Sequence, residues 1–204
     1  MPYVLRPRGF RATLTALLGA AAVLAVPAAA QAACATTPTT KAFQAFGDSA
    51  NYSLAPNGAF ETGAGGWSLT GAGVVSGSES FAVHAPGDSK SLAIGATGTA
   101  ASPAICVDID HPTFRFFARR TSGSWGVLNV KLRWKEANGT TNETVVGSLG
   151  TGTSWQASPV LNLSRSLPLW NASQTASVQL VFDPEDFGGA WAIDDVYVDP
   201  YARG

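Results

Sequence analysis

The chain has 204 residues, of which 46% are hydrophobic and 13% are charged, with a net charge of −1 at pH 7. This length is enough for one domain with a sizeable hydrophobic core. The charge balance excludes a typical nucleic-acid-binding surface, which needs an excess of basic side chains. We therefore predict no nucleic-acid partner.

The first 32 residues have the pattern of a secretory signal peptide. Three arginines precede an apolar stretch from Leu14 to Val26, and a small-residue tail ends at Ala32. The apolar stretch is shorter than the roughly 20 residues of a spanning helix, so we predict no membrane span. Cleavage removes three of 13 basic residues and leaves ten against 14 acidic ones, a net charge of about −4. The chain is predicted to be secreted.

Two cysteines, Cys34 and Cys106, follow the leader. An even number of cysteines in a secreted chain favours one disulfide, which would link the mature N-terminus to the domain. Neither cysteine has another Cys or a His at metal-ligand spacing, so a metal or nucleophile role is not predicted. The Ala-rich leader and the Gly- and Ala-heavy composition are typical of a bacterial protein.

Residues 33–55 are polar and Thr-rich at first and then rich in Ala, Asn and Ser. This composition predicts an N-terminal arm, held by Cys34 and by Phe43 and Phe46. The folded domain is expected to cover 56–204.

Beyond residue 56, apolar and polar residues alternate in short runs between Gly, Ser, Asn and Pro. The clearest run, 127–134, leads into the hairpin dipeptide Asn138-Gly139 and a partner strand at 144–146. The number and spacing of these runs predict an all-β sandwich of two antiparallel sheets. The expected strands are 67–69, 81–83, 91–94, 104–107, 114–119, 127–134, 144–146, 178–182 and 191–198.

Two motifs lie at opposite ends of this region. The first is Asn57-Gly58-Ala59-Phe60-Glu61 with Gly66-Trp67 behind it, and the second is Trp191-Ala192-Ile193-Asp194-Asp195-Val196. Together they resemble the opening and closing signature of carbohydrate-binding modules with the galactose-binding-like jelly-roll fold. The chain is also similar to secreted proteins of high-GC Gram-positive bacteria. The resemblance covers about 56–199.

The resemblance implies a jelly-roll β-sandwich that binds a carbohydrate or cell-envelope glycan without catalysis. An exported structural or adhesive protein that binds a protein partner is the alternative. The chain is expected to be a monomer.

Modules of this family commonly hold a structural calcium ion where their first and last strands meet. The resemblance therefore implies calcium bound by Glu61 with Asp194 or Asp195. Calcium takes about six to eight oxygen ligands, which carboxylates and loop carbonyls can supply. Neighbouring residues of a strand point to opposite faces, so only one aspartate is expected to be a ligand unless a bulge intervenes.

A sugar site needs aromatic faces for stacking and polar side chains to bind hydroxyl groups. Trp67, Trp134 and Trp191 fall at inward positions and are expected in the core. Outward aromatics on a concave sheet would favour glycan binding, whereas a flat, charged face would favour the protein-binding alternative. The predicted ligand-binding residues are Phe117, Arg115, Lys131, Arg133, Trp125, Trp155 and Gln179.

The segment Phe46-Gly47-Asp48-Ser49 resembles the nucleophile block of the Gly-Asp-Ser-Leu esterases, and Asp108-Ile109-Asp110-His111 resembles their closing Asp-x-x-His. Those enzymes are α/β proteins with this histidine near the C-terminus. Here no helical pattern follows, and His111 lies in mid-chain. We predict no catalytic residues and no enzymatic activity.

Overall fold

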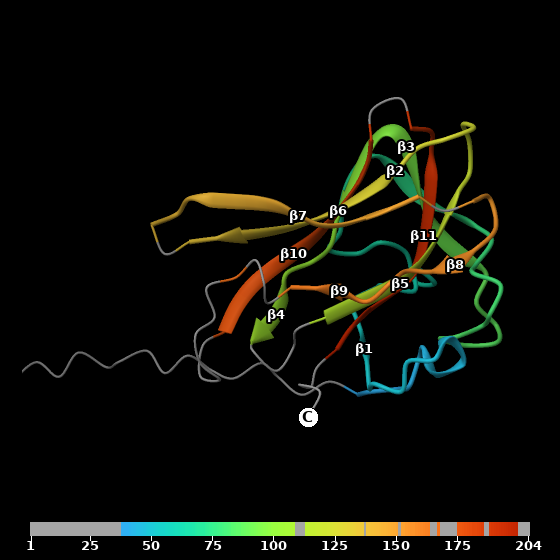
Figure 1. Ribbon diagram of the computed structural model, residues 1–204, viewed down its shortest axis with the longest axis horizontal. Helices are drawn as coiled ribbons and strands as arrows, with labels where there is room; N and C mark the ends of the chain where they lie inside the picture. The colour runs from blue at the N-terminus through green and yellow to red at the C-terminus, as the bar shows by residue number, and fades with distance from the viewer. Residues whose placement is uncertain are drawn as a thin grey trace, which may run out of the picture. The chain divides into compact units, whose positions relative to one another are not determined.

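The computed structural model of the chain describes residues 38–108, 113–136, 138–150, 152–163, 167, 175–185 and 188–199. These residues form an all-β unit, which confirms the predicted fold class (Figure 1). Within these ranges, the single short helical element is the 3-10 turn η1 (Gln44–Phe46), and no helix is long and apolar enough to cross a membrane. The strands are β1 (Ser53–Leu54), β2 (Ser68–Ser76), β3 (Lys90–Ala101), β4 (Ile105–Asp108), β5 (Thr113–Arg120), β6 (Leu128–Lys135), β7 (Thr141–Leu149), β8 (Gln156–Ala157), β9 (Leu161–Asn162), β10 (Thr175–Pro184) and β11 (Trp191–Val198).

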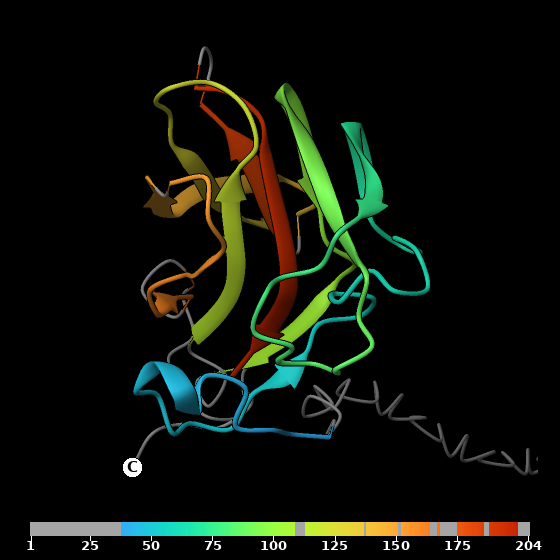
Figure 2. The same cartoon turned by 90° about the vertical axis from the view of Figure 1, so that its right-hand side faces the viewer.

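The strands form a curled antiparallel sheet with the path β7-β6-β10-β3-β11-β5-β8. The sheet makes a sharp turn between β10 and β3. At this turn the two strands share only two residue pairs, Val181 with Ala101 and Phe182 with Ala100. On one side of this turn lie β4, β6, β7 and β10, and on the other lie β3, β5 and β11 (Figure 2). The two halves enclose the main core as the layers of a β-sandwich do.

Aromatic side chains join the two halves across this core. Phe182 of β10 lies 4.9 Å from Phe116 of β5, ring centre to ring centre, and 6.0 Å from Trp67. Trp191 of β11 is fully buried in the same core. The prediction that Trp67 and Trp191 are core residues is therefore confirmed, and Trp134 packs against the core while partly buried.

Most predicted strands are present, and several are longer than expected. The turn around Gly139 joins β6 to β7, with Lys135 opposite Thr141, as the hairpin dipeptide predicted. The predicted strand at 81–83 is wrong. The backbone N–H groups of Phe81 and Val83 both donate to the carboxylate of Glu79, so they are not available to a sheet ladder.

Residues 38–54 lie against the sheet and form a second hydrophobic cluster with it. Phe43 stacks on Phe117 of β5 with 5.4 Å between ring centres, and Phe46 contacts the same ring at 5.3 Å. Tyr52 packs edge-on against Phe43 at 5.0 Å. Figure 2 shows this segment in blue beneath the ends of β5 and β11. Cys106 lies in β4, whereas Cys34 lies outside the described residues, so the disulfide remains a prediction.

The two end motifs meet at the last strand. β1 pairs with β11, with Ser53 opposite Val198. Farther along, Val196 accepts a hydrogen bond from Ala55 and donates one to the carbonyl oxygen of Gly58. A Cβ atom on Gly58 would lie 2.7 Å from the Val196 oxygen, so glycine is needed for this approach.

Candidate functional site

The last strand contains a bulge at its acidic pair. The pairing of β11 with β5 shifts between Asp194, opposite Phe117, and Tyr197, opposite Arg115. Asp195 has a φ of 48°, a left-handed conformation that aspartate tolerates better than most residues. Neighbouring residues of a regular strand would point to opposite faces, but this bulge interrupts the alternation at the aspartate pair. Both carboxylates are therefore buried on the same side of the unit, against the loop of residues 77–89.

Asp194 holds the first part of the 77–89 loop. One carboxylate oxygen accepts hydrogen bonds from the Ser78 hydroxyl at 2.9 Å and from the Glu79 amide at 2.8 Å. The other accepts the Asp195 amide at 2.9 Å. Glu79 in turn accepts the Phe81 and Val83 amides. These two buried carboxylates therefore have their hydrogen bonds within the protein.

Asp195 faces a different part of the same loop. Its Oδ2 atom accepts the backbone amide of His84 at 3.1 Å, whereas its buried Oδ1 atom has no hydrogen-bond partner among the described residues. The His84 ring lies beside it, with Nδ1 2.7 Å from Asp88 Oδ2. Potential ligand atoms of His84, Asp88 and Asp195 all lie within 4.8 Å of one another. These residues could hold a metal ion.

Burial and crowding of negative charge set the acidity of the aspartate pair. Burial is the main factor that raises the pKa of Asp194 to about 8, against the hydrogen bond from Glu79. Burial also raises the pKa of Asp195 to about 7, and the charges of Glu79, Asp88 and Glu61 add to this rise. A cation bound beside these carboxylates would lower both pKa values, because its positive charge favours the charged form of each.

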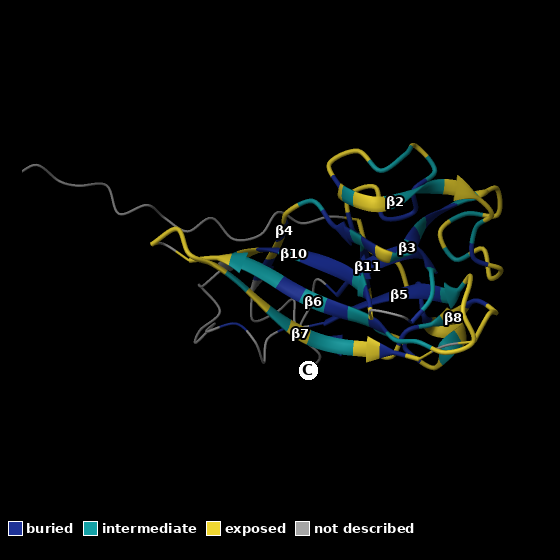
Figure 3. Cartoon of the chain, turned by 90° about the horizontal axis from the view of Figure 1, so that it is seen from above, coloured by how far each residue is buried: buried dark blue, intermediate teal, exposed yellow. Residues whose placement is uncertain are grey.

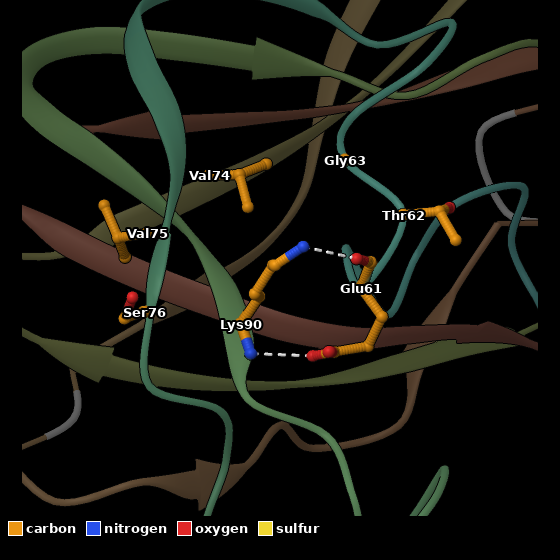
Figure 4. Close-up of a pocket in the computed structure, with 7 residues that line it drawn as sticks. All are labelled: Glu61, Thr62, Gly63, Val74, Val75, Ser76 and Lys90. Carbon is orange, nitrogen blue, oxygen red and sulfur yellow. Dashed lines mark hydrogen bonds between the residues drawn. The ribbon is translucent and has the colours of Figure 1, made fainter.

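Glu61, the third predicted metal ligand, lies at the edge of this acidic group. Its carboxylate accepts the amides of Ser89 at 2.8 Å and of Lys90 at 2.6 Å. Burial acts to raise the pKa of Glu61, but these hydrogen bonds outweigh it and lower the pKa. The Lys90 ammonium donates to the Glu61 carbonyl oxygen, as Figure 4 shows.

A shallow pocket opens between this glutamate and strand β2. It has a volume of about 400 Å³, and Figure 4 shows its lining side chains. One wall is formed by Val74 and Val75 of β2, and the other by residues 61–63, with Lys90 between them. Glu61 is close enough for its charge to act on Asp195, but it is not among the residues whose potential ligand atoms converge. The structure also shows three residues that the sequence analysis missed, namely Glu79, His84 and Asp88.

Three of the predicted ligand-binding residues are not outward-facing. Phe117 is fully buried under Phe43 and Phe46, and Arg115 is only 7% exposed. Trp155 is also buried, with the Arg119 guanidinium 5.0 Å from its ring centre. The prediction that Phe117 and Arg115 bind a ligand at the surface is wrong, because residues 38–54 cover this side of β5. Successive residues of β5 still alternate between two cores: Phe114, Phe116 and Ala118 lie in the main core, and Phe117 lies in the second cluster.

Arg115 is instead a structural cation. Its Nη1 atom donates to Asp48 at 3.0 Å, and Nε and Nη2 donate to the Ser158 carbonyl oxygen at 3.0 and 2.7 Å. The guanidinium also lies 4.4 Å from the ring centre of Phe43. Asp48, which the esterase comparison singled out, is thereby committed to an internal ion pair.

The other predicted contacts lie at accessible positions. Gln179 of β10 pairs with Arg133 of β6, and Arg133 pairs with Glu143 of β7. Lys131 lies two residue pairs farther along β6, opposite Val181 of β10. Trp125, 60% exposed, lies in the loop between β5 and β6. Figure 3 shows β6 and β7 with much intermediate and exposed surface. We call the outward residues of these strands the polar face: Gln179, Asp183, Asn129, Lys131, Arg133, Glu143, Val145 and Ser148.

Ion pairs order the polar face. Arg133 Nε lies 2.8 Å from Glu143, and Lys131 forms ion pairs with Glu143 at 3.5 Å and with Asp183. The hydrogen bond to Asp183 is the main cause of the raised pKa of Lys131. Among the described residues of this face, none is aromatic, and Val145 is the large apolar residue with 53% exposure. By the criterion stated above, a charged face favours the protein-binding alternative.

Comparisons with known proteins give the fold. No family model and no curated protein sequence matches the chain. The CBM22-1 and CBM22-2 xylan-binding domains of Paenibacillus barcinonensis Xyn10C match with TM-scores of 0.51 and 0.50 and identities of 17% and 16%. Each match covers 72% of this chain, and 93% and 98% of the respective domain.

The CBM22-1–GH10 modules of Clostridium thermocellum endo-1,4-beta-D-xylanase 10B, complexed with xylohexaose, match at a TM-score of 0.50 and 13% identity. That match covers 75% of this chain but only 28% of the xylanase chain. The matches thus include isolated binding domains as well as part of an enzyme. The chain is structurally similar to family 22 carbohydrate-binding modules. This similarity confirms the resemblance to carbohydrate-binding modules that the end motifs indicated.

Proposed function

We propose that the chain is a secreted, non-catalytic module that binds a carbohydrate or cell-envelope glycan through the polar face. The fold supports this proposal, because its solved neighbours include domains named for xylan binding. Fold alone does not determine function, so the proposal depends on the site. The observation that carries it is the ordered set of donors and acceptors on β10, β6 and β7.

Ion pairing prepares this face for hydroxyl groups. Arg133 and Lys131 are held by Glu143 and Asp183, so their remaining donors are fixed before a ligand arrives. Gln179 is held likewise, because its side-chain amide donates to the Ser102 carbonyl oxygen at 2.8 Å. We expect a neutral sugar to bind this face through hydrogen bonds to its hydroxyl groups. Because the described residues of the face include no aromatic ring for stacking, the affinity should be low.

The test is affinity electrophoresis through gels that contain xylan or another soluble polysaccharide. We expect retardation by at least one polymer, and a reduction of about five- to tenfold in affinity for Arg133→Ala, from the loss of roughly 1–1.5 kcal/mol of hydrogen bonding. Lys41→Ala, an exposed residue of the N-terminal segment, is the matched control. Free migration on every polymer would contradict the proposal.

A second candidate is an exported structural or adhesive protein that binds a protein partner through the same face. The observation that favours it is the exposed Val145 among charged residues, with no aromatic among the described outward residues of the polar face. Rim charges with a small apolar centre are typical of protein interfaces. Unretarded migration on all polysaccharides, together with loss of cell-surface binding in Val145→Asp, would favour this candidate.

We further propose that a divalent cation binds at Asp195 and ties the last strand to the 77–89 loop. The unpartnered, buried Oδ1 atom of Asp195 supports this position. Calcium at Glu61 with Asp194 or Asp195, as the resemblance implies, is one form of this proposal. Of the two aspartates, Asp195 is the better ligand, because both oxygens of Asp194 already accept hydrogen bonds.

A further inference from the structure

The 77–89 loop and the bulge of β11 bring together three potential metal ligands, one imidazole and two carboxylates. His84 and Asp88 come from the loop, and Asp195 lies 111 residues after His84. Their potential ligand atoms lie within 4.8 Å of one another, and His84 Nδ1 lies 2.7 Å from Asp88 Oδ2, so an ion would replace this contact. Figure 2 shows this loop, in green, against the lower part of β11, in red.

The Asp195 carboxylate indicates that the group is built for an ion. The residue is only 1% exposed, and its Oδ1 atom is buried without a hydrogen-bond partner in the described part of the chain. A buried acceptor without a partner costs roughly 1–3 kcal/mol, and more when it is charged. Such an atom calls for an explanation, of which an ion is one.

The neighbouring carboxylates do not compete for this role. Glu79 is occupied by the amides of Phe81 and Val83, and Asp194 by Ser78, Glu79 and Asp195. They shape the loop that carries His84. The backbone amide of His84 donates to Asp195 Oδ2 at 3.1 Å, which fixes the loop backbone against the bulge.

Access is open from the histidine side. The His84 side chain is 38% exposed and that of Asp88 is 10% exposed, whereas Asp195 closes the inner end. An ion could enter from solvent past the imidazole and keep water at its outer positions.

The imidazole distinguishes between classes of ion. Calcium is bound by oxygen atoms. Zinc and other late first-row ions accept imidazole nitrogen together with carboxylate oxygen in sites of three protein ligands with an open position. We propose that His84, Asp88 and Asp195 bind one divalent transition ion of the zinc class in preference to calcium. This inference rests on the cation proposed above and is independent of glycan binding.

The test is calorimetric titration of the EDTA-treated, dialysed full chain with zinc chloride and, separately, with calcium chloride. We expect one zinc ion per chain and an affinity for zinc at least about tenfold above that for calcium. His84→Ala should weaken zinc binding about 100-fold and leave calcium binding unchanged. Since the chain has two histidines, His111→Ala is the matched control and should bind zinc like the unchanged protein.

A second measurement keeps the test independent of folding. Cobalt(II) added to the apo protein should give visible d–d absorption that zinc displaces and that His84→Ala abolishes, with unchanged far-UV circular dichroism. Calcium that binds as tightly as zinc, or zinc binding that survives in His84→Ala, would overturn the inference and leave the cation proposal standing. Binding of neither ion would overturn both, and polysaccharide retardation would still test the glycan proposal separately.

Discussion

The ion pair of Asp48 and Arg115 provides the sharpest test of the N-terminal segment's role. Both side chains are 8% exposed, and their atoms lie 3.0 Å apart. Asp48→Ala would leave the Arg115 guanidinium buried with one donor unpaired, and it would remove the acceptor of the Tyr52 hydroxyl at 2.7 Å.

Removal of one partner of a buried ion pair costs about 3–5 kcal/mol. The hydrogen bonds that Asp48 accepts from Arg115, Tyr52 and the Ala50 amide are consistent with that range. For a domain of this size the loss corresponds to a decrease of roughly 6–20 °C in Tm. Urea unfolding followed by tryptophan fluorescence gives the free energy directly.

The control is Lys41→Ala in the same segment, an exposed position where we expect a change within about 0.5 kcal/mol. The double variant Asp48→Ala with Arg115→Met should be more stable than the sum of the single effects by at least about 1 kcal/mol, because it no longer buries an unpaired charge. A change below 1 kcal/mol for Asp48→Ala would refute the reasoning, and it would mean that the buried ion pair contributes little to holding the N-terminal segment on the sheet.

Two further predictions concern the last strand. In EDTA, the free energy of unfolding should fall by roughly 1 kcal/mol per pH unit between pH 5 and 8, because burial raises the pKa of Asp194 to about 8 and the folded state then binds more protons than the unfolded one. Thermal melts of Asp194→Asn should lose much of this slope, whereas the exposed Glu185→Gln should keep it. Gly58→Ala should cost about 1–3 kcal/mol, because its Cβ atom would meet the Val196 oxygen at 2.7 Å. Gly87→Ala, where a Cβ atom meets nothing within 4 Å, should change the stability by less than about 0.5 kcal/mol.

Local sequence patterns predicted the sheet well, because alternation is a property of each strand. The run at 127–134 became β6 with Leu128, Val130 and Leu132 buried, and its hairpin partner followed. The end motifs also predicted that first and last strands meet, since Gly58 and Val196 are joined by hydrogen bonds. The strand and its hairpin need only nearest-neighbour chemistry, whereas the meeting of the chain ends followed from the family resemblance.

Alternation could not show what covers the second face of a strand. Phe117 and Arg115 have the same spacing whether water or another segment lies over them. The residues that decide this, Phe43 and Tyr52, lie far away in the chain and in a segment with the composition of a loop. Few sequence patterns indicate that a charged residue of a strand is buried. One such pattern is an arginine between two phenylalanines, as for Arg115 between Phe114 and Phe116.

The candidate metal group shows the same limit. Asp194 and Asp195 were found because they belong to a motif, and the bulge that turns both to one side depends on tertiary pairing. His84 and Asp88 are four residues apart in a loop without periodicity, and only the fold brings them to Asp195. The wrong prediction of a strand at 81–83 is one reason why these residues were missed. Such a strand would have placed His84 at its end rather than beside the Asp195 carboxylate.

The two proposed sites are connected to different parts of the sheet, which makes their effects separable. Asp195 lies in β11, whereas the polar face lies on β10, β6 and β7, and the two halves are joined by β3 through only two residue pairs with β10. β11 is also held by the cluster of Phe43, Phe117 and Tyr197, so loss of the cation should loosen the strand locally rather than reorganise the sheet. Chelation should therefore lower Tm without changing polysaccharide retardation. If chelation lowered Tm and also abolished polysaccharide retardation, the polysaccharide would contact the 77–89 loop instead of the polar face.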